Sequence, residues 1–395
     1  MFKKTKETKV LRDVIHGYIH VHYQVIWDCI NAKEMQRLRR IHQLGGVYQI
    51  YHTAEHSRFS HSLGVYEIVR RMVQEVEDIA DQLSESEKIQ VMCAGLLHDL
   101  GHGPFSHFFE GLQDIDHEQR TRVLIRDTQT EIHQALSACD PQLPEQVVSI
   151  LDGTHPKEML HQMISSQLDA DRMDYLLRDA YETGTSYGTF DLERILRTMR
   201  VENGQICMKE SGMHSVEDYI MARYHMYWQV YLHPDVKAYE LLIEAFFKRY
   251  NDIRHTCPIE ALEPFERTLT NGEFLSLDES VMTFAFHQAA EKDDAVLKDL
   301  ANRILNRKLF HWIQNPDPRQ TQAIAEQLTK EQKSLEYYYH ESRHASGMYL
   351  PYIENTHPIR ILQSDGRVVT LSAVSEIVKA LLRMETTPDL RIYYG

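Results

Sequence analysis

The chain has 395 residues, of which 43% are hydrophobic and 26% charged, and its formal net charge is −15. This balance is typical of a globular protein, and the acidic excess gives no strong signature of nucleic-acid binding. The longest apolar run, residues 91–97, is too short to cross a bilayer, and the five scattered cysteines indicate reduced thiols. We therefore expect a cytoplasmic protein without a membrane segment.

The first predicted element is a short β-hairpin over residues 9–22, where apolar and polar residues alternate around His16 and Gly17. From about residue 24 to residue 255 the apolar positions follow a helical period, interrupted by loops rich in Gly, Pro or Asp. These patterns predict a mainly α fold, with a first domain over residues 1–260.

The remaining residues, 261–395, are expected to form a small α+β module. Residues 313–320 contain two prolines and are predicted to be a loop or linker. Residues 357–371 predict a second hairpin that turns at Asp365-Gly366. A helix over residues 373–382 and a strand near residues 392–394 are expected to close the chain.

A histidine-rich segment follows the apolar run, where residues 95–107 read GLLHDLGHGPFSH. The adjacent His98 and Asp99 offer a divalent metal one nitrogen and one oxygen ligand, and His102 lies about one helical turn further on. The glycines and the proline end the helix and let the backbone bend around a ligand. This segment resembles the signature of the HD superfamily of metal-dependent phosphohydrolases.

The resemblance implies a metal site that takes one His from an earlier helix, the His-Asp pair, and an Asp from a later helix. The ligands in this chain would be His61, His98, Asp99 and Asp171. A shell of two His and two Asp leaves positions open for water or phosphate oxygens. It therefore suits one six-coordinate Mg, Mn or Fe ion better than a closed zinc site, with zinc as the alternative.

Further segments resemble one branch of that superfamily, the deoxynucleoside triphosphate triphosphohydrolases. They are residues 36–45 (QRLRRIHQLG), 56–65, 97–107 and 169–179. This branch includes the mammalian enzyme with a sterile-alpha-motif domain and the bacterial dGTPase-like proteins. The resemblance implies a homotetramer that hydrolyses dNTPs to deoxynucleoside and tripolyphosphate.

The same resemblance assigns residues to the phosphates, sugar and base of the substrate. They are Gln43, Leu44, Arg58, Arg172, Tyr175, Asp179, Arg223 and Tyr231. Helical spacing places Arg172, Tyr175 and Asp179 on one face, and Arg223, Tyr227 and Tyr231 on one face of a helix predicted over residues 219–231. Tyr227 departs from the mammalian pattern, which has His there. A solvated or core-packing helix face is the alternative interpretation of both sets.

The histidines expected around the α-phosphate are His102, His107 and His117, with Glu118 able to orient His117. A metal ion and a protonated imidazole together neutralise charge at phosphorus and protonate the leaving oxygen. A surface location is the alternative for His107.

An activating nucleotide bound between subunits is a further expectation from the resemblance. Gln36 and Arg39 match positions that bind guanine nucleotide, but Asn31 stands where the mammalian enzyme has an acidic residue. An Asn side chain offers no bidentate charged acceptor, which puts guanine specificity in doubt. The alternative is that Gln36, Arg37 and Arg39 form an ordinary exposed helix face.

Two other functions stay open at this point. One is an HD phosphohydrolase for another nucleotide class, and the other is a non-catalytic nucleotide sensor. Small HD nucleotidases lack the segments around Gln43 and Arg223, so these two segments favour the dNTPase.

Overall fold

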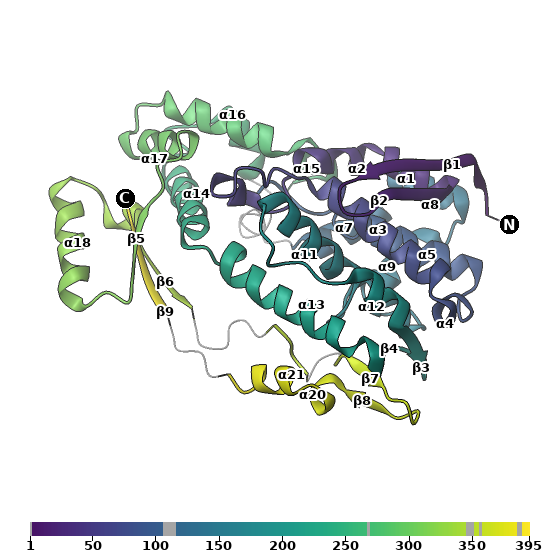
Figure 1. Ribbon diagram of the computed structural model, residues 1–395. Helices are drawn as coiled ribbons and strands as arrows, with labels where there is room; N and C mark the ends of the chain where they lie inside the picture. Colours follow the sequence, from purple (N-terminus) through teal and green to yellow (C-terminus); the bar gives the residue numbers. More distant parts are fainter. Residues whose placement is uncertain (1, 106–115, 267–268, 345–350, 355–357, 385–388) are drawn as a thin grey trace.

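The computed structural model describes residues 2–105, 116–266, 269–344, 351–354, 358–384 and 389–395. Most elements are helices, which confirms the predicted mainly α fold (Figure 1). Within the described ranges, no helix is both long and apolar enough to cross a membrane.

The predicted N-terminal hairpin is present. Strand β1 (Lys4–Asp13) pairs antiparallel with β2 (Gly17–Tyr23), and Asp13 lies opposite Gly17. Gly17 has a φ of +70°, a left-handed conformation that glycine adopts without strain. The side chains of Ile19, Val21 and Tyr23 are buried, so one face of β2 packs on the helices behind it.

Three helices form the centre of the molecule: α3 (Arg58–Glu75), α5 (Glu85–Leu97) and α11 (Ala170–Thr183). Helix α3 packs against both of the others. A capping box of Ser84 and Glu87 starts α5, and the Asp169 side chain caps α11, because each accepts a hydrogen bond from an otherwise unpaired N–H.

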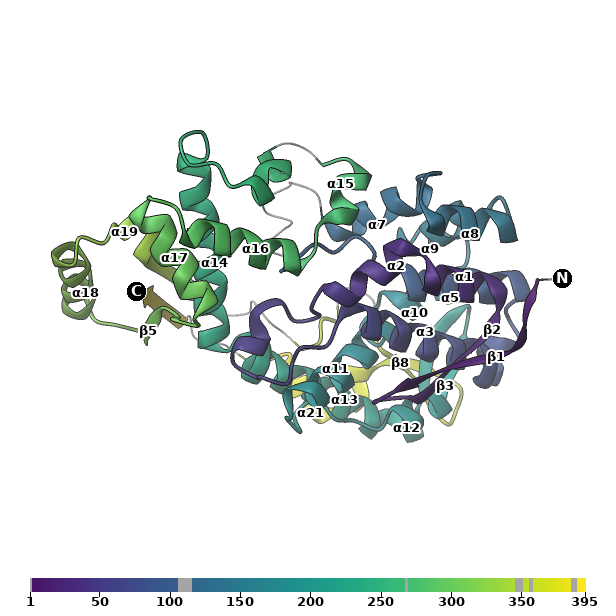
Figure 2. The ribbon, with the colours of Figure 1, turned by 90° about the horizontal axis from the view of Figure 1, so that it is seen from above.

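Further helices surround this centre (Figure 2). They are α1 (Gln24–Asn31), α2 (Lys33–Arg37), η1 (Leu38–Arg40), η2 (Gly45–Gln49), α4 (Glu77–Ala80), α7 (His117–Arg126), α8 (Glu131–Cys139), α9 (Leu143–Leu151), α10 (Glu158–Ile164), α12 (Leu192–Thr198), η3 (Glu210–Gly212), α13 (Met213–Met226), η4 (Tyr227–Tyr231) and α14 (Pro234–Ile253). The described helices between residues 260 and 338 are η5 (Glu260–Glu266), α15 (Asn271–Ser276), α16 (Glu279–Ala290), α17 (Ala295–Leu305), α18 (Pro318–Lys330) and α19 (Leu335–Tyr338).

The helical expectation for residues 24–255 was wrong at residues 199–209. Strands β3 (Met199–Glu202) and β4 (Gln205–Lys209) form a hairpin around Asn203 and Gly204, whose positive φ angles suit a two-residue turn. The helix predicted over residues 219–231 ends as an α-helix at Met226, and η4 continues it as a π-helix. The wider π-helical turn changes the direction in which Tyr231 points relative to the α-helical part.

Two C-terminal predictions were also wrong in part. Residues 313–320 are not all loop, since β5 (His311–Gln314) ends there and α18 begins at Pro318. Asp317 and Gln320 form a capping box, so residues typical of loops instead start a helix. The helix predicted over residues 373–382 is two helices, α20 (Leu371–Val374) and α21 (Glu376–Leu381), because the Ser375 side chain caps a new start.

The strands after residue 260 belong to two separate sheets (Figure 1). Strand β9 (Asp389–Tyr394) lies between β5 and β6 (Tyr339–His344) in one sheet. The predicted second hairpin, β7 (Arg360–Leu362) and β8 (Val368–Thr370), is confirmed, and β7 pairs in parallel with β4. The boundary at residue 260 stays a prediction, and one sheet contains strands from both sides of it.

Candidate active site

The four predicted metal ligands lie together where the three central helices meet. His61 Nε2 lies 3.0 Å from Asp171 Oδ1, and His98 Nε2 lies 3.3 Å from Asp99 Oδ1 and 3.7 Å from Asp171 Oδ1. Candidate ligand atoms of His61, His98 and Asp99 all lie within 4.8 Å of one another. Helix α3 supplies the first histidine, the C-terminal end of α5 the His-Asp pair, and the first turn of α11 the second aspartate.

The hydrogen bonding of His98 fits a divalent cation at this cluster. His98 Nδ1 lies 2.9 Å from the carbonyl oxygen of Gly95, which can only accept, so Nδ1 carries the hydrogen. Nε2 of the neutral ring then holds a lone pair. This atom is buried without a hydrogen-bond partner among the described residues, and it faces the Asp99 carboxylate. A bound cation would satisfy both His98 Nε2 and the Asp99 carboxylate. A ligand set of two imidazoles and two carboxylates suits Mg, Mn or Fe.

His61 is oriented by a residue that sequence reasoning missed. Its Nδ1 donates to Asp174 Oδ2 at 2.9 Å, and Asp174 lies one turn after Asp171 on α11. Burial raises the pKa of Asp174, but the charge of Arg178 and hydrogen bonds from neighbouring donors outweigh burial and hold that pKa well below its usual range. The sequence offered one signal for Asp174. It lies three residues after Asp171, and this spacing places both aspartates on one helix face.

Arg58 and two histidines complete the immediate surroundings of the cluster. Arg58 Nη1 donates to Asp99 Oδ2 at 2.6 Å, and His102 Nε2 lies 3.4 Å from Asp99 Oδ1. The rings of His102 and His117 are stacked, with centroids 3.8 Å apart. Burial lowers the pKa of His102 well below its usual range, and the Arg58 charge acts in the same direction. His102 is therefore neutral near pH 7.

Of the other two predicted catalytic residues, Glu118 alone is among the described residues. Glu118 is exposed, and its carboxylate lies 3.6 Å from Arg122 Nη1, so its role toward His117 stays a prediction. His107 lies outside the described residues.

A cavity of about 830 Å³ opens beside the cluster. This volume is in the range of small-molecule sites. Its wall includes six of the predicted substrate residues, namely Gln43, Leu44, Arg58, Tyr175, Asp179 and Tyr231, as well as Tyr227. Helix α14 and strand β6 contribute Lys237, Glu240, Glu244 and Arg343 to the same wall.

A row of polar and aromatic side chains leads away from the metal cluster. The Tyr175 ring centroid lies 6.4 Å from that of His61 and 6.3 Å from that of Tyr231. The Tyr231 hydroxyl donates to Asp179 Oδ2, and His56 Nε2 lies next to Asp179 Oδ1, both at 2.7 Å. His56 was not singled out from the sequence, although it lies inside one of the resembling segments.

Two predicted phosphate-binding arginines are not among the residues that line this cavity. Arg172 forms an ion pair with Asp169, the residue that caps its own helix. Arg223 Nη1 donates to Gln167 Oε1 at 3.2 Å and to the Pro351 carbonyl at 3.0 Å. Their contacts with substrate stay predictions.

The three predicted allosteric residues bond mainly to their own segment. Asn31 Nδ2 donates to the Trp27 carbonyl, Gln36 Nε2 donates to the Ile30 carbonyl, and Arg39 Nε donates to Gln36 Oε1. Nucleotide binding by these residues stays a prediction.

Arg37 differs from the exposed helix face considered for it. It is buried, and it donates to the carbonyl oxygens of His102 and Leu277, each at 2.8 Å. Its guanidinium also stacks on the Phe274 ring, 4.3 Å from the centroid. Arg37 therefore connects the His102 segment to the chain just before α16, and sequence periodicity gave no signal of this contact.

The comparisons with known proteins agree with this site. Residues 58–179 match the HD domain and residues 190–341 match the HD associated region. The chain is 44% identical over 406 residues to the uncharacterized protein YwfO of Bacillus subtilis, covering 99% of this chain and 93% of that protein. It is 28% identical over 349 residues to the deoxynucleoside triphosphate triphosphohydrolase SAMHD1 homolog of Dictyostelium discoideum, covering 83% and 66% of the two chains.

A crystal structure of a phosphohydrolase from Bacteroides thetaiotaomicron superposes with a TM-score of 0.88 and 27% identity, covering 98% of this chain and all of that one. The chain belongs to the HD-domain phosphohydrolase family and carries the HD associated region.

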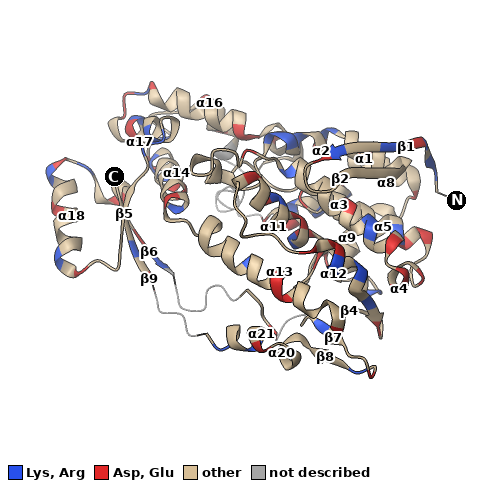
Figure 3. Cartoon of the chain, in the orientation of Figure 1, with Lys and Arg blue, Asp and Glu red and all other residues tan. Residues whose placement is uncertain are grey.

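Acidic and basic residues are interspersed over its elements, as Figure 3 shows.

Proposed function

We propose that this HD phosphohydrolase cleaves deoxynucleoside triphosphates to deoxynucleoside and tripolyphosphate. The observation that carries the proposal is that one cavity joins the metal cluster to groups suited to a sugar. Gln43 Oε1 lines this cavity and is buried without a hydrogen-bond partner in the described part of the chain. A sugar hydroxyl would donate its one hydrogen to this acceptor or to Asp179, while the Tyr175 ring would pack on the sugar. The activity named for the Dictyostelium relative supports the same substrate class.

In the proposed reaction His61, His98, Asp99 and Asp171 would hold a metal ion, which would supply positive charge to the phosphate oxygens. Arg58 contacts the metal cluster through its hydrogen bond to Asp99. It adds a fixed positive charge to the end of the cavity where the phosphates would bind. We assign the proton for the leaving oxygen to His117, because His102, stacked on it, has a pKa too low to carry one near pH 7.

We further propose a cytoplasmic homotetramer in which a nucleotide bound near Gln36 and Arg39 activates the enzyme. The supporting observations are the family resemblance of these two residues and the reduced state of the five cysteines. Gel filtration with light scattering, with and without added nucleotide, tests the assembly separately from the chemistry.

The activity is tested by incubating the protein with single and mixed dNTPs and Mn²⁺ or Mg²⁺, followed by ion-exchange chromatography of the products. We expect deoxynucleoside and tripolyphosphate in equal amounts. Release of orthophosphate or pyrophosphate would indicate another HD phosphohydrolase. Nucleotide binding without turnover in any mixture would indicate a sensor.

A further inference from the structure

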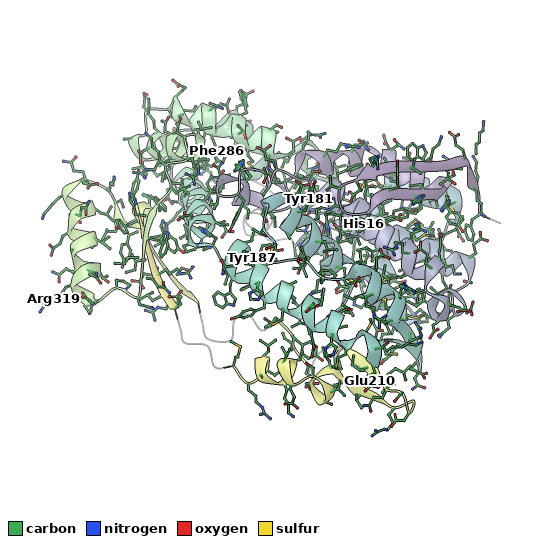
Figure 4. The ribbon with its side chains drawn as sticks, in the orientation of Figure 1. His16, Tyr181, Tyr187, Glu210, Phe286 and Arg319 are labelled. Atoms are coloured by element: carbon green, nitrogen blue, oxygen red, sulfur yellow. The ribbon has the colours of Figure 1, made fainter. Side chains whose placement is uncertain are left out.

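The turn of the N-terminal hairpin contacts the second layer of the metal cluster. Asp13 Oδ1 accepts from the backbone N–H groups of Ile15 and His16, at 2.9 and 3.0 Å, which fixes the turn. The His16 side chain is only 2% exposed, and its Nε2 lies 2.7 Å from Asp174 Oδ1. Figure 4 labels His16, which lies among the side chains where the hairpin meets the helices.

Asp174 receives four hydrogen bonds, two at each oxygen. His16 Nε2 and Arg178 Nη2 donate to Oδ1, at 2.7 and 2.9 Å. His61 Nδ1 and Arg178 Nε donate to Oδ2, at 2.9 and 2.8 Å. Because a carboxylate only accepts, both histidines must carry a hydrogen on the nitrogen that faces it.

Arg178 links Asp174 to the hairpin a second time. Its Nη1 lies 2.9 Å from Asp13 Oδ2 and its Nη2 lies 3.2 Å from Asp13 Oδ1. The side chains of Asp13, Arg178 and Asp174 are 7%, 1% and 0% exposed. In such a dry setting each lost donor removes a hydrogen bond to a charged group that water does not replace, so Asp13, Arg178 and Asp174 have one favoured arrangement.

That arrangement determines which nitrogen of His61 can bind a metal. With a hydrogen held on Nδ1 by Asp174, Nε2 is the nitrogen left for a metal. It faces Asp99 and Asp171, and it would bind a metal ion in its unprotonated form. Carboxylates that orient a ligating histidine in this way commonly change metal affinity by 10- to 100-fold when they are removed, as a rough range.

We propose that Asp13 and His16 of the hairpin turn are positioning residues for the metal ligand His61, so that tight binding of a divalent cation requires the docked hairpin. This inference rests on the proposed metal site. It assigns a role in the site to a segment that precedes residue 58, where the HD match begins.

The test measures Mn²⁺ affinity of the full-length, metal-stripped protein from the electron paramagnetic resonance signal of free Mn²⁺. His16→Leu removes the donor to Asp174 and should weaken Mn²⁺ binding by roughly 10-fold or more. His16→Gln retains an N–H at a similar position and should restore most of the affinity. Asp13→Asn keeps an acceptor for the turn but loses the charge that pairs with Arg178, and should also weaken binding.

His20→Leu is the matched control. His20 lies on the same hairpin, its ring is 42% exposed, and it faces Glu67 rather than Asp174. Its Mn²⁺ affinity should equal that of the wild type. Circular dichroism spectra and thermal unfolding of each variant show whether it is folded. If His16→Leu does not fold, the Mn²⁺ affinities of His16→Gln and Asp13→Asn are compared instead. The inference then requires near wild-type affinity in His16→Gln and weakened binding in Asp13→Asn.

Wild-type affinity in folded His16→Leu and Asp13→Asn, together with lost affinity in Asp171→Ala, would overturn the positioning role and leave the metal site intact. Wild-type protein that binds no Mn²⁺ would reject the metal site, and the inference with it.

Discussion

Replacing Gly64 by Ala tests how closely α3 must approach α11. Gly64 is one turn before Ile68 in the middle of α3, where helix propensity alone favours Ala by about 1 kcal/mol. A Cβ at this position would overlap the Asp174 carboxylate and lie 2.5 Å from Arg178 Nη2. The backbone of a packed helix cannot move away without cost, so the two effects have opposite signs.

The packing effect is the larger of the two. Forcing an extra carbon into a filled core costs about 1–3 kcal/mol. Displacing Asp174 also breaks at least one hydrogen bond between charged groups, which costs about 1.5–3 kcal/mol. After the gain in helix propensity is subtracted, we expect Gly64→Ala to lower the free energy of unfolding by about 1.5–5 kcal/mol.

The control is Gly95→Ala in α5, a second helical glycine of the same core. Its Cβ would meet Val69 Cγ2 at 3.0 Å and Ile164 Cδ1 at 3.3 Å, which are methyl groups at the ends of apolar side chains. Urea unfolding followed by circular dichroism should show a much smaller loss for this variant, of about 1 kcal/mol or less. A Gly64→Ala protein as stable as the wild type would refute the close approach of the two helices at Asp174.

Three further predictions concern the chemistry. Asp171→Ala should abolish hydrolysis and lose the bound metal, measured by elemental analysis, because it deletes a ligand. Full metal content with full activity would contradict the ligand assignment. His117→Ala should keep its metal and lower kcat by about 10²-fold, as expected for a lost proton donor; an unchanged kcat would move that role to another histidine. The protein should cleave dGTP roughly 10²-fold faster than GTP, because a ribose 2′-hydroxyl would press against Tyr175 and lose its water. It should also cleave 2′,3′-dideoxy-GTP poorly, because Gln43 Oε1 would lack its donor. Equal rates on dGTP and GTP with any activator held constant would reject the dNTPase proposal.

Local patterns in the sequence were enough to single out the His98-Asp99 pair and the two hairpins at the ends of the chain, and the family resemblance added His61 and Asp171 to the candidate metal ligands. The His98-Asp99 pair and the alternation around Gly17 depend on residues a few positions apart, and such spacing is what a helical or extended backbone translates directly into geometry. The same local reasoning failed where one residue type has two uses. Asp317 and Pro318 were interpreted as a linker, yet together they start α18.

The tertiary structure alone decided which polar groups meet across the core. His16 and Asp174 are far apart in the sequence, as are Arg37 and Leu277, and no periodicity relates them. Their contacts arise because burying the apolar faces of the helices removes water from nearby polar groups, and each group must then find a partner from whatever segment the packing brings close. For this reason the sequence determined the candidate metal ligands of the site, whereas only the folded chain determined what orients His61 and which arginines line the cavity.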